Sequence, residues 1–162
     1  MVRSIITLII TLFISGSVYL QQAPEDKNAN KELYKVLSNN IRYPRVLVEK
    51  NQSSFFTLKI KFGGDKKIKD ITASKYAPKE VIKDGTNPEN YKTVNWEAIL
   101  KEKPKEGDIL IIPISIYSSS EQNTIFYEYT LEDAFNYNGN MQNPIKCMIL
   151  QPVVLKHGPV IH

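Results

Sequence analysis

A stretch of strict apolar–polar alternation constrains the fold of this chain most strongly. Residues 54–62 place large apolar side chains at every second position, with Thr or Lys between them: Phe56, Leu58, Ile60 and Phe62. A period of two predicts a strand with one buried face. The Gly-Gly-Asp-Lys at residues 63–66 predicts a turn that allows positive φ. Residues 67–74 then read as the return strand, so we expect a β-hairpin.

A second strand is predicted at residues 109–117, the most apolar segment after the N-terminus. It contains Pro113, which has no backbone N–H to give to a neighbouring strand. Proline inside a strand is typical of a sheet edge or of a bulge. We therefore expect this strand to lie at an edge of the sheet, or to be bulged at Pro113.

Two short helices complete the predicted α+β fold. The first has apolar side chains three and four residues apart, which indicates one buried helical face: Leu33, Val36, Leu37 and Ile41. Asn30 is its expected N-cap, and residues 44–52 after it are expected to be a connection. Asn95 is expected to cap a second amphipathic helix at residues 96–103. Together with the strands, these helices predict a small, mostly antiparallel sheet packed against two helices.

The N-terminal residues 1–20 have the pattern of an export signal. Arg3 precedes an apolar run, and the small residues Ser-Gly-Ser follow at 15–17. The apolar stretch of about sixteen residues is shorter than the roughly twenty that a spanning helix needs. A cleaved signal is therefore favoured, with an uncleaved anchor as the alternative. We expect a periplasmic or secreted protein with no stable membrane span after cleavage, and a polar, flexible lead at residues 21–31.

The remaining chain is expected to form one domain with a C-terminal extension. Residues 32–118 contain the predicted helices and strands, joined by a loop-like segment at residues 75–92. Residues 119–162 are expected to pack on the same domain as a β extension. Within the extension, residues 124–129 and residues 146–155 have the composition of further strands.

The chain offers few side chains for catalysis or metal binding. With one cysteine it forms no intrachain disulfide. Cys147 and His157 are the only conceivable thiol and base pair, and they suit a buried strand and a C-terminal tail better. A zinc site needs three or four ligands that the two histidines and one cysteine do not supply. We therefore expect no enzyme activity, no metal and no cofactor.

The charge pattern also argues against nucleic acid as a partner. The formal net charge is +4, but the lysines are scattered and offset by acidic residues. Nucleic-acid-binding domains usually gather their positive charge on one stripe. One acidic and aromatic cluster, at residues 127–133, leaves a hydrolase as a minor alternative.

The order of these elements resembles the C-terminal domain of TonB, the energy transducer of bacterial outer-membrane uptake. The resemblance covers residues 33–117. It rests on the Tyr-Pro after the first helix, the hairpin with its Gly-Asp turn, the helix from Trp96, and the Ile-Pro-Ile around Pro113. A TonB transducer also has a long spacer that crosses the periplasm, whereas here only residues 21–30 separate the signal from the domain. At about 3.3 Å per residue this segment is too short for that role.

The resemblance implies how this chain binds a partner. In the TonB family a partner peptide adds as a strand to an exposed sheet edge, a general mode of peptide recognition. The corresponding edge is the predicted strand at 109–117, with candidate binding residues Ile109, Ile111, Pro113, Ser115 and Tyr117. The expected function is a non-enzymatic envelope module that binds an extended peptide of an envelope protein. The main alternative is an envelope structural protein whose C-terminal extension caps this edge. Residues 124–129 and residues 146–155 are the segments that could cover it, and a fully paired edge would favour this alternative.

Overall fold

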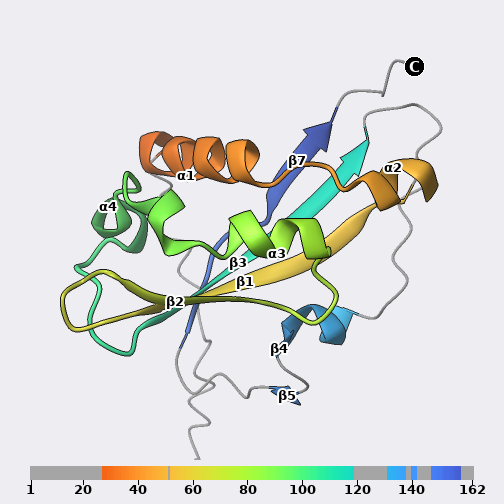
Figure 1. Cartoon of the computed structure of the whole chain (residues 1–162). Coiled ribbons are helices and arrows are strands. Elements are labelled where there is room, and N and C mark those ends of the chain that lie inside the picture. The colour runs from red at the N-terminus through yellow and green to blue at the C-terminus, as the bar shows by residue number, and fades with distance from the viewer. Residues whose placement is uncertain (1–26, 51, 119–130, 138–139, 142–146, 158–162) are drawn as a thin grey trace, which may run out of the picture.

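The computed structural model describes residues 27–50, 52–118, 131–137, 140–141 and 147–157 (Figure 1). In chain order the elements are α1 (Lys27–Asn40), α2 (Arg45–Lys50), β1 (Ser54–Phe62), β2 (Ile68–Ala73), α3 (Lys79–Gly85), the 3₁₀ helix η1 (Pro88–Tyr91), α4 (Trp96–Leu100), β3 (Ile109–Ser118), the 3₁₀ helix η2 (Leu131–Phe135), β4 (Asn136–Tyr137), β5 (Asn140–Met141), β6 (Met148–Ile149) and β7 (Val153–His157). The predicted α+β fold class is confirmed.

One mixed sheet organises the molecule. Its order is β2-β1-β3, and β6 and β7 both pair with the far side of β3. β1 is antiparallel to β2 and to β3, which confirms the predicted hairpin. β6 and β7 run parallel to β3, and Figure 1 shows β7 beside β3 with its arrow in the same direction. The antiparallel ladders were expected from the alternation, whereas the parallel C-terminal strands were not.

Helices α1, α3 and α4 cover one face of the sheet (Figure 1). Leu33, Leu37 and Ile41 of the first helical segment are buried, as their spacing predicts. The facing strands contribute fully buried side chains from alternate positions: Phe56, Leu58, Ile60, Phe62, Leu110, Ile112, Ile114 and Ile116. Because this alternation continues across β1 and β3, the main core lies between the helices and these two strands.

Trp96 anchors the short helix α4 in this core. Its ring meets Phe62 edge to face, with the ring centroids 5.6 Å apart. The predicted cap at Asn95 is confirmed, since its side chain accepts a hydrogen bond from the Ala98 N–H at 3.1 Å. The helix ends at Leu100, earlier than predicted, because Lys101 takes a left-handed φ of 62°.

Three further local predictions are wrong. α1 begins at Lys27, so the end of the expected flexible lead is helical and Asn30 lies inside the helix. The expected connection at residues 44–52 contains α2, and the loop-like segment at residues 75–92 contains α3 and η1. The predicted turn at residues 63–66, by contrast, does contain a positive φ, at Lys66 (64°). The helical segments α2, α3 and η1 are too short to show a long periodic pattern, which is why the spacing of apolar residues did not reveal them.

The opposite face of the sheet is covered in part by η2 and by the antiparallel β4–β5 pair (Figure 1). Thr57 of β1 connects these elements to the sheet. Its hydroxyl lies 2.5 Å from the Ala134 carbonyl oxygen and 2.5 Å from the Tyr137 hydroxyl. A hydroxyl has one proton to donate, so Thr57 donates to the carbonyl and Tyr137 donates to Thr57.

Among the described helices, none combines the length and the apolar character that crossing a bilayer requires. The predicted signal at residues 1–20 and the predicted strand at residues 124–129 lie outside the described residues.

Candidate functional site

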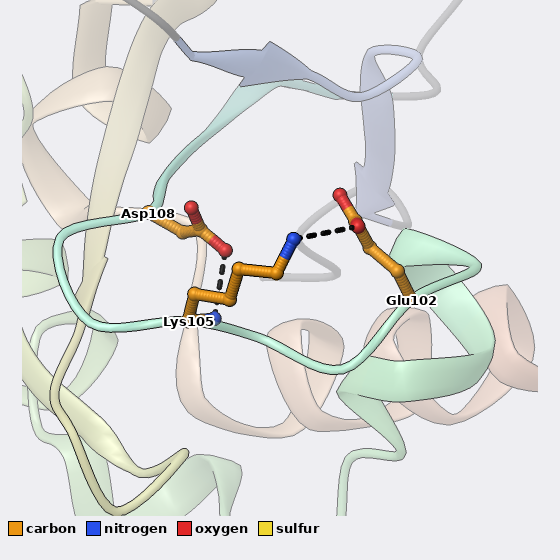
Figure 2. Close-up of polar contacts among 3 residues, drawn as sticks. All are labelled: Glu102, Lys105 and Asp108. Carbon is orange, nitrogen blue, oxygen red and sulfur yellow. Dashed lines mark hydrogen bonds and ion pairs between the residues drawn. The ribbon is translucent and has the colours of Figure 1, made fainter.

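A fixed turn sets the start of β3, the strand that carries the predicted binding residues. Figure 2 shows Lys105 between two acidic side chains, with its ammonium 3.3 Å from Glu102 and its N–H donating to the Asp108 carboxylate at 2.7 Å. Gly107 has a φ of 86°, which glycine adopts without strain. The N–H of Phe62 donates to the Asp108 carbonyl at 3.0 Å. This turn therefore ties the beginning of β3 to the end of β1.

The expectation that β3 lies at a sheet edge is wrong. On one side β3 pairs with β1 over its length. On the other side Leu110 and Ile111 pair with β6, and the segment from Ile114 to Ser118 pairs with β7. The candidate binding residues Ile109, Ile111, Pro113, Ser115 and Tyr117 therefore belong to an interior strand, whose outer side the chain's own C-terminal strands occupy.

The alternative expectation, a bulge of β3 at Pro113, is not what the pairing shows, because β3 stays in continuous register with β1 through this residue and the extra residue lies on the C-terminal segment opposite. Ile111 pairs with Ile149, but Ile114 pairs with Val153, so the C-terminal segment holds one more residue than β3 between these points. The extra residue lies opposite the segment of β3 that contains Pro113. Pro113 has no backbone N–H to donate to a neighbouring strand. An irregularity opposite this residue therefore costs no additional hydrogen bond. Pro152 on the C-terminal segment has the same effect.

β7 is held to the sheet by a five-residue ladder with β3 and by one almost completely buried side chain. Leu155 is 2% exposed and joins the main core beside Ile116. Val153 packs partly against the same core. The alternate residues face the other side of the sheet, where Val154 is 40% exposed and the Lys156 ammonium lies 5.6 Å from the centre of the Tyr117 ring.

β6 is attached less firmly than β7. It has two residues, and Met148 and Ile149 are 38% and 54% exposed. Six large hydrophobic side chains are exposed in the described part of the chain, and three of them belong to these two C-terminal strands. Ile149 and Val154 share the face of the sheet opposite the helices, whereas Met148 points to the other face. Exposed apolar side chains on outermost strands are typical of an interaction surface.

The other end of the sheet is less suited to strand addition. β2 pairs with β1 alone among the described strands. Its Lys69 and Asp70 are exposed, and the register shifts between Lys61 and Phe62 on β1. Charged side chains and bulges are the features by which edge strands avoid pairing with other chains.

The polar cluster around Tyr137 has the character of a structural contact. Burial raises the pKa of the Tyr137 phenol to about 12, and the hydrogen bond from Tyr137 to Thr57 opposes this shift. The Lys59 ammonium lies 4.5 Å from the centre of the Tyr137 ring, and burial lowers the pKa of Lys59. Burial also raises the pKa of the Cys147 thiol, which lowers its reactivity at neutral pH.

Within the residues that it describes, the structure gives no functional arrangement to the other candidate catalytic or metal-binding groups. Of the acidic and aromatic cluster at residues 127–133, the structure describes the side chain of Asp133 but not those of its neighbours. Within the described residues, no group of three His, Cys, Asp or Glu side chains is placed to hold a metal ion.

The residues that sequence reasoning missed are Val153, Leu155 and Pro152. The segment at residues 146–155 was predicted as a strand and as one of two segments that could cover the outer side of β3, but its parallel direction and its register were not predicted. Its apolar residues two apart, after a proline, are the only local signal, and pairing with a strand almost forty residues earlier leaves no local mark. No family model, curated protein or solved structure matches this chain.

Proposed function

We propose that this chain is an exported, non-enzymatic module of the cell envelope that binds an extended peptide of an envelope protein by strand addition. The site is the C-terminal side of the sheet, where β3 meets β6 and β7. The observation that supports this most is that β3 already accepts strands on its outer side, from two short, interrupted segments. These segments occupy the outer side of β3, so a guest has to displace them, and their shortness and the interruption between them are what make displacement feasible.

The exposed apolar side chains support the same location. Met148, Ile149 and Val154 expose apolar surface on the outermost described strands of this side. A guest peptide that covered them would gain about 25 cal/mol for each Å² of apolar area removed from water. The charged β2 edge offers no such gain.

The alternative is an envelope structural protein whose sheet edge is permanently closed by its own C-terminus. The burial of Leu155 favours this function, because a fully buried leucine stabilises the closed arrangement by about 1.5–3 kcal/mol. The two functions differ in one property: whether the C-terminal side of the sheet responds to an added peptide.

NMR titration of the ¹⁵N-labelled chain with extended peptides from envelope proteins tests the proposal. We expect chemical-shift changes along β3 and β7, centred on Ser115 and Val154, with none in α1 at the exposed Tyr34. A Tyr117→Ser variant alters the β3 strand that the guest pairs with and should weaken binding, while Tyr34→Ser should not. If no envelope peptide shifts β3 or β7 at millimolar concentration, peptide binding is rejected and the structural function stands.

A further inference from the structure

We infer that β7 occupies the place of the guest strand, so that the chain's own sequence at residues 151–157 shows what kind of peptide the site accepts. This inference rests on the proposed function. It adds three properties: the guest replaces β7, it runs parallel to β3, and it carries two aliphatic side chains two residues apart.

The packing of β7 against β3 and the core indicates which positions of a guest peptide must be aliphatic. Val153 lies beside Ile114 and Leu155 lies beside Ile116, all on the face that packs against the helices. Leu155 is almost completely buried, so a guest in this place needs a branched aliphatic side chain there to fill the same space. A charged residue at this position would be buried without a partner, which costs several kcal/mol.

The opposite face defines the remaining positions. Val154 lies beside Ser115 and is substantially exposed, so this position tolerates many side chains. Lys156 lies beside Tyr117, with its ammonium near the aromatic ring. A cation near an aromatic face is attracted to it, by about 0.5–1 kcal/mol at an exposed site. The preferred guest is therefore aliphatic–any–aliphatic–cationic, read from the N-terminus.

The interruption before β7 explains how a guest could compete. β7 is continuous for five residues. Residues 150–152 separate it from the two residues of β6, and they are one residue more than β3 has between the same paired positions. A guest without this interruption can lie along β3 as one strand. The tethered β7 still has the advantage of a high effective concentration, in the millimolar range for short linkers. Binding to the unmodified chain should therefore be weak, and it should strengthen when β7 is loosened.

The test uses the full chain and a capped synthetic peptide with the sequence of residues 151–157. Leu155→Ala loosens β7, and it should tighten peptide binding by about tenfold or more, because binding requires the open state. Into this variant, Ser115→Cys and Val154→Cys are introduced together with Cys147→Ser. The two new cysteines are directly opposite each other, so oxidation locks β7 onto β3 and reduction releases it.

We expect the reduced protein to bind the peptide and the oxidised protein to lose binding. A peptide with Asp in place of Leu155 should bind neither form. A peptide with the reversed sequence keeps two aliphatic residues two apart but has no cation after them, so it should bind the reduced form a few-fold more weakly. Equal binding by the oxidised protein would show that the guest does not replace β7, and equal binding of all three peptides would refute the sequence preference. Both of these results leave peptide binding itself intact. If the reduced protein binds none of these peptides but responds to envelope peptides, the inference fails alone; if it responds to neither, the proposed function fails with it.

Discussion

Replacing Thr57 by valine should destabilise the fold far more than the size of the change suggests. The two side chains have nearly the same shape, but valine has no hydroxyl. Thr57 is fully buried, and its hydroxyl accepts a hydrogen bond from Tyr137 and donates one to the Ala134 carbonyl. The substitution leaves both partners buried without a hydrogen bond. Each such loss costs about 1–3 kcal/mol, so we expect about 3 kcal/mol in total after the apolar gain of the methyl group.

Thr57→Ser is the matched control, because it keeps the hydroxyl and removes one methyl group at a cost of about 1 kcal/mol. Tyr137→Phe removes a single hydrogen bond and should cost about 1 kcal/mol. Urea unfolding followed by the fluorescence of the one tryptophan, Trp96, measures these values. The reasoning is refuted if Thr57→Val costs no more than Thr57→Ser, or if the Thr57→Val and Tyr137→Phe effects simply add.

Three further predictions concern stability. Leu155→Ala should lower the free energy of unfolding by about 2–3 kcal/mol in the same urea assay, since it empties a buried site, whereas Val154→Ala should cost less than about 0.5 kcal/mol; equal costs would contradict the seating of β7. Burial raises the pKa of Tyr137 to about 12 and also raises that of Tyr91, so the stability that these shifts contribute is complete below pH 10 and is lost as the pH rises above 10 through the folded values. Tyr137→Phe should flatten this loss of stability in urea unfolding at alkaline pH. An unchanged slope against pH would exclude Tyr137 as its source. Asn95→Ala should cost about 1 kcal/mol by thermal unfolding, with Asn95→Asp near neutral, and equal losses would show that the cap contributes nothing.

The sequence was sufficient for the elements whose pattern is long and local. The hairpin followed from alternation between Phe56 and Phe62, and α1 followed from the spacing of Leu33, Leu37 and Ile41. In each case burial of one face gives a regular period that a single segment displays. The start of β3 at Ile109 was predicted from a nearly continuous apolar run, which is another local signal.

The sequence was insufficient where contacts are long-range. Pro113 suggested an edge or a bulge of β3, and only the pairing partners decide. β1 on one side and β6 and β7 on the other make β3 interior, and the register irregularity lies on the C-terminal segment opposite this proline. The contact of Thr57 with Tyr137 joins residues 80 positions apart, and a threonine in an alternating strand carries no sign of it. The strand that carries the candidate residues was therefore predicted, but its interior position in the sheet was not.

Native-state hydrogen exchange of the full chain tests the central claim, that β7 covers β3 and opens separately from the rest of the sheet. The account predicts that the amides of Val153–His157 exchange through a local opening, with a free energy well below that of β1 and little dependence on denaturant. It is contradicted if β7 and β1 share one opening free energy with the same dependence on denaturant, because β7 would then leave the sheet only when the whole protein unfolds.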